Sequence, residues 1–167
     1  SCDATGSDVD EQPVSLSYAW SIDDVTQVET GPTFQSTFSY GQTVACTVTP
    51  NDGISNGASI SASITVANTP PTITSIDFST LALKTNDVAA ISVSTADVDG
   101  DTPTLTYNWY VDNTLIENND FATLDGSLHF SKDQDIYVEV HLSDGLDEGV
   151  PMSSDVLTIL NSEPTIP

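Results

Sequence analysis

The fold is decided by a stretch that occurs twice, first as Tyr18-Ala19-Trp20-Ser21-Ile22-Asp23-Asp24 and again, 89 residues later, as Tyr107-Asn108-Trp109-Tyr110-Val111-Asp112-Asn113. Two further segments return 92 residues later: Val44-Ala45-Cys46-Thr47-Val48 as Ile136-Tyr137-Val138-Glu139-Val140, and Asn51-Asp52-Gly53 as Ser143-Asp144-Gly145. Self-similarity at a fixed spacing indicates a repeated structural unit. The unit has about 93 residues, which is the usual size of an immunoglobulin-like sandwich.

Alternation of apolar and polar residues predicts β-strands in both copies. In the second copy, every second residue from Leu105 to Val111 is apolar, and so is every second residue from Ile136 to Leu142. Gly, Pro, Asn and Asp separate these segments, and no segment has a helical period. We therefore predict an all-β fold of two tandem immunoglobulin-like β-sandwich domains, each with its Trp in the core. The predicted strands of the second domain span residues 73–78, 88–94, 104–111, 128–130, 135–142 and 156–160.

The domain boundaries follow from the register of the repeat. We predict a first domain at residues 1–67, a second at 68–161, and the start of a following strand or repeat at 162–167. The first domain lacks the counterpart of residues 72–89, which include the opening strand. Pro164-Thr165-Ile166 copies Pro71-Thr72-Ile73, with which that strand begins. The missing strand is thus expected either upstream in a longer chain or from a neighbouring protomer.

The two cysteines occupy a meaningful pair of positions. Cys2 aligns with Ile91 of the second copy, and Cys46 aligns with Val138. In immunoglobulin domains a disulfide joins these two strands beside a Trp of the kind found here at Trp20. We predict a Cys2–Cys46 disulfide, which would imply an oxidising compartment. Two buried free thiols are the alternative.

The composition limits the partners. Two Lys and Arg residues against 25 Asp and Glu residues give a net charge of −23. Nucleic acids and anionic membrane surfaces bind through clustered cations, so we expect neither as a partner. No apolar run reaches the roughly 18 residues of a membrane span, so we expect no membrane insertion. Cations, neighbouring domains and neutral surfaces such as glycans remain as partner classes.

Acidic turns at the ends of the predicted strands are candidates for calcium binding. The stretch Asp97-Val98-Asp99-Gly100-Asp101 places carboxylates at alternate positions, and its glycine permits a tight turn around a hard cation. The turn at Asp144 is expected at the same end of the sandwich. Asp and Gly also favour turns without any metal, so a solvated acidic turn is the alternative. The predicted calcium ligands are Asp97, Asp99, Asp101, Asp144 and Asp147, with a second set in the first copy comprising Asp8, Asp10, Glu11 and Asp52.

Four motifs together resemble a known group of repeats. They are Asp-x-Asp-Gly-Asp at 97–101, Leu-Thr-Tyr-x-Trp-x-Val-Asp at 105–112, Val-x-Val-x-x-Ser-Asp-Gly at 138–145 and Asn-x-x-Pro-Thr-Ile at 68–73. The chain resembles the tandem cadherin-like and polycystic-kidney-disease-like immunoglobulin-fold repeats of large bacterial surface and secreted proteins. This resemblance implies an extracellular or cell-surface location and calcium that makes the array rigid.

The sequence carries no motif of an enzyme, so we expect no catalytic activity. His129 and His141 are not expected to be ligands. The expected function is that of a non-catalytic extracellular structural module, a repeat segment of a cell-surface adhesin or filament. Its expected partners are neighbouring immunoglobulin-like repeats or identical protomers head to tail. The alternative is an accessory carbohydrate- or protein-binding module of a secreted hydrolase, for which Tyr110 and Tyr137 point outward by phase.

Overall fold

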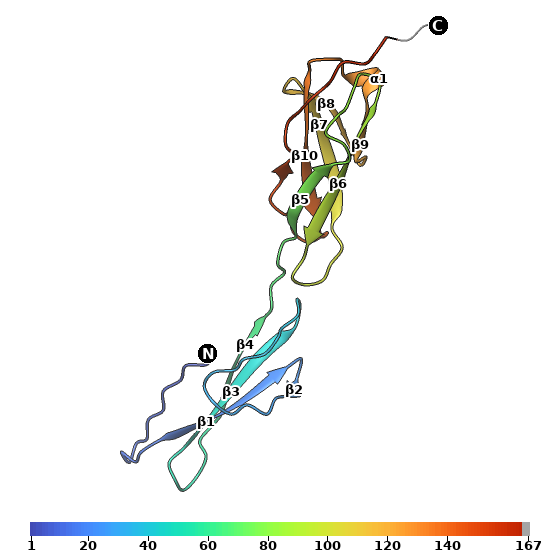
Figure 1. Cartoon of the computed structure of the whole chain (residues 1–167). Helices are drawn as coiled ribbons and strands as arrows, with labels where there is room; N and C mark the ends of the chain where they lie inside the picture. Colours follow the sequence, from blue (N-terminus) through green and yellow to red (C-terminus); the bar gives the residue numbers. More distant parts are fainter. Residues whose placement is uncertain (165–167) are drawn as a thin grey trace. The chain divides into compact units, whose positions relative to one another are not determined.

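The chain forms two compact units in a computed structural model, Ser1–Asn68 and Thr69–Pro167. The structure describes residues 1–164, without the side chains of residues 117–119. Part of the predicted C-terminal strand start, residues 165–167, therefore lies outside the described residues. Nearly all of the regular structure is antiparallel β-sheet (Figure 1), which confirms the predicted all-β fold.

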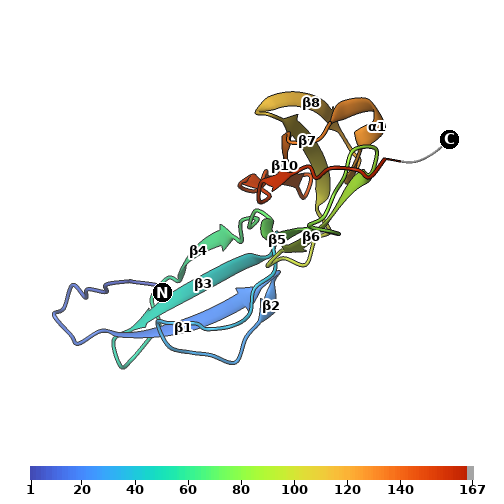
Figure 2. The same ribbon diagram turned by 45° about the horizontal axis from the view of Figure 1, so that its top comes forward.

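Unit 1 contains one antiparallel sheet (Figure 2). Its strand order is β2 (Val25–Thr26), β1 (Ser15–Ile22), β3 (Thr43–Asn51) and β4 (Ile60–Thr65). β1 pairs with β3 over its whole length, and Trp20 lies opposite Cys46. Because side chains alternate between the faces of a strand, one face of this sheet buries Trp20, Val44, Cys46 and Val48. Residues 1–14, which align with β6 and the loop after it in unit 2, contain no strand.

The edge strand β4 has an uncovered apolar side. Ile64 is paired with Val44, and Ile60 is paired with Val48. Residues directly opposite each other in a sheet share a face, so both isoleucines belong to the core-facing side. Their side chains are nevertheless exposed, at 71% for Ile60 and 70% for Ile64. The core of unit 1 is therefore open along β4.

Unit 2 is a sandwich of two sheets. One sheet has the order β5 (Thr72–Phe78), β6 (Val88–Ala96) and β9 (Thr123–Asp125). The other has the order β11 (Met152–Ser153), β10 (Asp135–Ser143), β7 (Thr104–Val111) and β8 (Thr114–Asn119), with β12 (Leu157–Thr158) also paired to β10. Both sheets contribute to one core around the fully buried Trp109. This division of the strands is that of an immunoglobulin-like fold.

One predicted strand of unit 2 is wrong. Residues 128–130 were expected as a strand, but the short helix α1 (Gly126–His129) lies there, and β9 precedes it. The Asp125 side chain accepts a hydrogen bond from the Ser127 N–H at 2.9 Å and starts the helical turn. Leu128 is exposed while Phe130 is buried, which imitates the alternation of a strand. The predictions for 73–78, 88–94, 104–111 and 135–142 agree with β5, β6, β7 and β10 to within two residues.

Candidate functional site

Asp97 organises the loop between β6 and β7. Its Oδ1 atom accepts hydrogen bonds from three consecutive backbone N–H groups, those of Asp99 (2.7 Å), Gly100 (2.9 Å) and Asp101 (3.3 Å). Gly100 has a φ of +88°, a left-handed conformation that glycine adopts at little cost. The predicted turn is present, and one oxygen of Asp97 holds it in place.

The second carboxylate oxygen of Asp97 is in a different situation. This Oδ2 atom is shielded from solvent and accepts no hydrogen bond in the described structure. An acceptor buried without a donor is costly, and a cation would satisfy it. The neighbouring Asp99 Oδ2 accepts a hydrogen bond from the Thr69 N–H at 2.7 Å, which ties the start of unit 2 to the loop. Carboxylate oxygens are the ligands that calcium prefers, so the buried Oδ2 fits a calcium ligand.

The turn after β10 is built in the same way. Asp144 Oδ1 accepts hydrogen bonds from the N–H groups of Leu146 (2.7 Å) and Asp147 (2.8 Å), and Gly145 has a φ of +94°. Across the described part of the chain, no three Asp, Glu, His or Cys side chains form a group that could hold a metal. Both acidic loops of unit 2 are thus formed, but calcium binding by the five predicted ligands stays a prediction.

The first acidic turn of unit 1 follows the same plan. Asp8 Oδ1 accepts a hydrogen bond from the Asp10 N–H at 2.7 Å. Glu11 then has a φ of +60°, in the left-handed region that Gly100 occupies in unit 2. The two units therefore turn the chain alike, although a residue with a side chain replaces the glycine.

The second acidic turn of unit 1 meets the first at a surface hollow. Asp52 Oδ1 accepts hydrogen bonds from the N–H groups of Ile54 and Ser55, both at 2.7 Å. The bonds from Ser55 and Ile54 hold the pKa of the Asp52 carboxyl below its usual value. Asp8 and Asp52 both line a hollow of about 240 Å³. The structure thus brings these two predicted ligands to one place.

The predicted disulfide is confirmed. Cys2 and Cys46 are bonded, with their Cα atoms 6.5 Å apart. The Cys2 N–H donates to the Pro32 carbonyl at 2.8 Å, as the Ile91 N–H of unit 2 donates to the Ala122 carbonyl at 3.0 Å. The bridge therefore holds the opening segment at the position that β6 takes in unit 2.

A hydrogen-bond network built on Asp112 closes the end of the β7–β10 pair. Asp112 accepts hydrogen bonds from the Asp135 N–H (3.0 Å) and from Gln134 Nε2 (2.7 Å), and Gln134 Oε1 accepts one from the Ser131 N–H (2.8 Å). The Asp135 N–H and then the Gln134 amide lower the pKa of the Asp112 carboxyl. The network holds the turn after β7 against the segment that leads into β10.

Unit 1 contains the same network. Asp23 accepts hydrogen bonds from the Thr43 N–H (2.8 Å) and Gln42 Nε2 (3.3 Å), and Gln42 Oε1 accepts one from the Ser39 N–H (2.9 Å). The sequence signal for this network is that Gln42 and Gln134 are identical residues at the repeat spacing, although the alternation of apolar residues that predicts the strands does not point to them.

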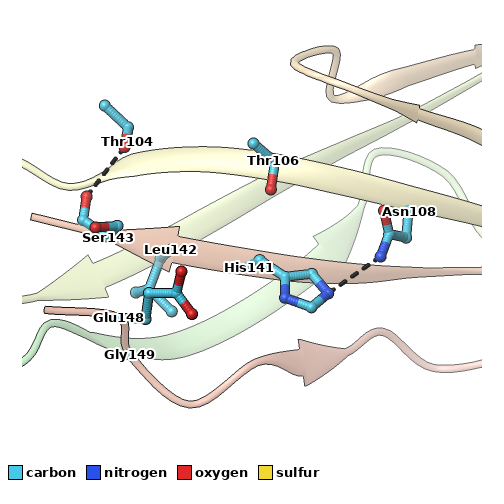
Figure 3. Close-up of a pocket in the computed structure, with 8 residues that line it drawn as sticks. All are labelled: Thr104, Thr106, Asn108, His141, Leu142, Ser143, Glu148 and Gly149. Atoms are coloured by element: carbon cyan, nitrogen blue, oxygen red, sulfur yellow. Dashed lines mark hydrogen bonds between the residues drawn. The ribbon is translucent and has the colours of Figure 1, made fainter. Parts of the chain in front are cut away.

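A polar groove lies on the outer face of unit 2 (Figure 3). Its volume is about 300 Å³. Asn108 on β7 and His141 on β10 are in contact within it, with 3.1 Å between Asn108 Nδ2 and His141 Nε2. Glu139 Oε1 lies 2.7 Å from the same ring nitrogen. The groove is lined by Thr104, Thr106, Asn108, His141, Leu142, Ser143, Glu148 and Gly149.

The outward phase predicted for the two tyrosines agrees with the structure. Tyr110 lies directly opposite Tyr137 in the β7–β10 pair, next to Asn108 and Glu139 in the row. The two rings stack, with centroids 4.7 Å apart and planes 7° from parallel. The phenol rings therefore form a rigid aromatic end to the polar row.

Comparison with known proteins gave no match, either to a protein-family model or to a curated protein sequence. None of the helices in residues 1–164 combines the length and the apolar character that crossing a membrane requires.

Proposed function

We propose that this chain is a non-catalytic structural module, a repeat segment of an extracellular adhesin or filament of the cadherin-like or polycystic-kidney-disease-like kind. The observation that carries the proposal is the repetition of hydrogen bonds between the units. The same Asp and Gln side chains close the same turns in both, at Asp23 and Gln42 and at Asp112 and Gln134. The polar residues that the units share serve to build the scaffold, which is the pattern of a repeated spacer.

The disulfide supports an extracellular location. A structural disulfide persists in an oxidising environment such as the cell exterior. In unit 1 the Cys2–Cys46 bond lies beside Trp20, within a core of four buried residues in the described structure. A small core of this kind depends more on a covalent link than a large one does, so a disulfide that persists outside the cell would stabilise unit 1 there.

Calcium is the proposed cofactor of the loops in unit 2. Its support is the buried, unbonded Oδ2 atom of Asp97 in a chain of net charge −23. A divalent cation there would satisfy this oxygen and relieve the mutual repulsion of the carboxylates. Asp99, Asp101, Asp144 and Asp147 are the proposed further ligands.

Neighbouring repeats or identical protomers are the proposed partners. Ile60 and Ile64 expose the core-facing side of β4, whereas Leu157, the counterpart of Ile64 in unit 2, packs against a core that two sheets enclose. A strand from a neighbour that paired with the opening segment of unit 1 would complete its second sheet. Head-to-tail contact of this kind extends a filament when its rotation does not close into a ring.

A replacement experiment tests the structural function. In the full-length protein that carries this chain, the two units are deleted in one strain and replaced by two unrelated immunoglobulin-like domains in another. Because a spacer acts through its length, we expect deletion to shorten the filament, or the reach of the adhesin from the cell surface, and replacement to restore that length. If replacement fails as deletion does, the units act through their own surface and the spacer proposal is wrong.

A further inference from the structure

The two units share a scaffold but differ on one face. In each, the paired strands β1 and β3 or β7 and β10 present alternate residues to the outer side of the sheet. In unit 1 the outward pairs are Ser17 with Thr49, Ala19 with Thr47 and Ser21 with Ala45. In unit 2 the pairs at the same register are Thr106 with His141, Asn108 with Glu139 and Tyr110 with Tyr137.

Folding does not account for this difference. Unit 1 forms the same antiparallel pair in the same register with small Ala, Ser and Thr side chains. The stacked tyrosines of unit 2 stabilise the strand pair by a direct cross-strand contact. The amide, carboxylate and imidazole beside them have no counterpart in unit 1 and lie half exposed on the surface, with 42% of the His141 side chain and 35% of the Glu139 side chain exposed. Because only unit 2 carries these groups, they point to the binding of a ligand at this face.

The groove offers hydrogen-bonding groups that it does not use itself. Asn108 Nδ2 and Glu139 Oε1 both approach Nε2 of His141, at 3.1 Å and 2.7 Å. One ring nitrogen cannot accept from the amide and donate to the carboxylate at the same time. Whichever bond forms, the other group is left for a ligand. On the neighbouring segment, the Glu148 carboxylate points toward the His141 ring and adds a further acceptor (Figure 3).

The charge of the groove selects a neutral ligand. Lys84 and Lys132 are the only cationic Lys or Arg residues of the chain, and neither lines the groove. A phosphate, sulfate or uronate group would meet the carboxylates of Glu139 and Glu148 without a Lys or Arg side chain to offset them. Hydroxyl groups, which both donate and accept, match a lining of carboxylate, amide, imidazole and threonine hydroxyl. The volume of about 300 Å³ is at the small end of ligand sites, which span roughly 300–1,000 Å³.

We propose that the outer face of β7 and β10 binds a neutral oligosaccharide. Asn108, Glu139 and His141 hydrogen-bond its hydroxyl groups from the strands, and Glu148 does so from the segment after β10. The Tyr110–Tyr137 stack provides apolar contact at the end of the row. This binding site is independent of the proposed spacer function, which depends on length and fold and not on this face.

The test variant replaces the proposed binding residues of unit 2 with the residues that unit 1 carries at the same positions, because unit 1 folds with them. A triple variant, Asn108→Ala with Glu139→Thr and His141→Thr, gives unit 2 the residues that unit 1 carries at the same register. The control variant, Ser17→Ala with Thr47→Ala, changes the outer face of unit 1 only. The probes are the neutral sugars cellohexaose, xylohexaose, mannohexaose and N-acetylchitohexaose, with the cationic chitosan hexamer as a charge control. Each is titrated to millimolar concentration into the intact chain by calorimetry. Amide chemical shifts then locate the bound sugar.

We expect at least one of these probes to bind, with shifts confined to the outer face of β7 and β10. The triple variant should weaken binding at least tenfold while keeping the thermal transition of unit 2, and the control variant should not change the affinity. The proposal is overturned if no probe binds, if the triple variant binds as well as the parent chain, or if only the cationic chitosan hexamer binds and salt abolishes that binding. None of these outcomes bears on the replacement experiment for the spacer function.

Discussion

Single carboxylates set the turns of this protein. Asp8, Asp52, Asp97 and Asp144 each accept backbone N–H groups two to four residues ahead, while Asp112 accepts one from Asp135. Hydrogen bonds to an ionised carboxylate favour the charged form. Some of the many carboxylates of this chain therefore hold backbone turns in place and do not serve only as surface charge.

The hydrogen bonds to Asp112 make the stability of unit 2 depend on pH. The pKa of the Asp112 carboxyl is lowered in the folded state from 3.8 by the Asp135 N–H and the Gln134 amide. The stabilisation by the ionised carboxylate is thus complete above the unfolded pKa and is lost as the pH falls through the lowered folded pKa. We expect Asp112→Asn to unfold more easily at neutral pH. Gln134 Nε2 and the Asp135 N–H both donate, and the Nδ2 group of the new side chain cannot accept a hydrogen bond as the second carboxylate oxygen does. The stability of the variant should also fall less steeply below pH 3.8.

Chemical denaturation across this pH range measures both effects. Asp77→Asn, at an exposed position of β5, is the control and should leave the pH profile of the free energy of unfolding unchanged. Equal profiles for the Asp112→Asn variant and the parent chain would mean that the Asp112 network does not contribute to stability.

At the scale of elements, strands were predictable where one face is buried throughout. Trp109, Val111, Val138 and Val140 alternate with polar or exposed residues and are all buried, so β7 and β10 follow from the sequence. The short α1 does not follow from it. One turn of helix is too short to display a period of 3.6, and its start depends on the local bond from Ser127 to Asp125.

Gly126 makes that helical turn possible. A Cβ atom at this position would collide with the backbone carbonyl of Asp87 and with the ring of the buried Phe130. Phe130 is held in the core, and the Asp87 carbonyl accepts the Gly126 N–H at 2.9 Å, so neither neighbour can easily move away. We expect Gly126→Ala to destabilise unit 2 by about 2 kcal/mol. The control Leu128→Ala, at an exposed position of the same helix, should cost less than about 0.5 kcal/mol. A similar loss in both variants, measured by urea unfolding, would contradict this account of the turn.

The acidic loops were predictable as turns, but their ligand geometry was not. Asp-x-Asp-Gly-Asp identifies the turn, because Gly100 adopts a positive φ and Asp97 accepts the following N–H groups. Whether the side chains converge depends on the separation of the β6–β7 loop from the turn after β10. Packing between the sheets sets that separation, so it cannot be predicted from the sequence of either motif.

Calcium should act on these loops. With calcium at a hundred times its dissociation constant, binding to the folded form adds about 2.7 kcal/mol to stability. We expect the melting temperature of unit 2 to be higher in calcium than in chelator at fixed ionic strength, and Asp97→Asn to remove the difference. The control Asp77→Asn should keep it. If the melting temperature of the parent chain is the same in calcium and in chelator, the loops are acidic turns without a metal.

At the scale of the whole molecule, the two units enclose their central Trp residues differently. Unit 2 encloses Trp109 between two sheets, and its exposed fraction is 0%. Unit 1 packs Trp20 against one sheet, the ring of Phe34 at 5.4 Å and the disulfide. The repeat spacing predicted the equivalent strand pairs of the two units, β1 with β3 and β7 with β10. It could not predict how far the remaining segments would cover the exposed face of β4.

The disulfide should therefore matter to one unit only. Cys2 and Cys46 are separated by 44 positions, and a cross-link of that span stabilises by about 4 kcal/mol in the chain-entropy model. Unit 1 has a small core with an open side, so this contribution is a large part of its stability. Unit 2 contains no cysteine and should not respond.

We expect reduction, or the pair Cys2→Ala with Cys46→Ala, to unfold unit 1 while unit 2 stays folded. Each unit contains one tryptophan, so the two can be followed separately by the indole N–H signals of Trp20 and Trp109 in nuclear magnetic resonance spectra. The Trp20 signal should move to its unfolded position and exchange rapidly with solvent, because its bond to the Gly31 carbonyl (2.9 Å) is lost. The Trp109 signal, bonded to the Phe121 carbonyl (3.2 Å), should remain in place. Loss of both signals together would mean that the units fold as one cooperative body, and retention of both would mean that the single sheet of unit 1 is stable without its covalent link.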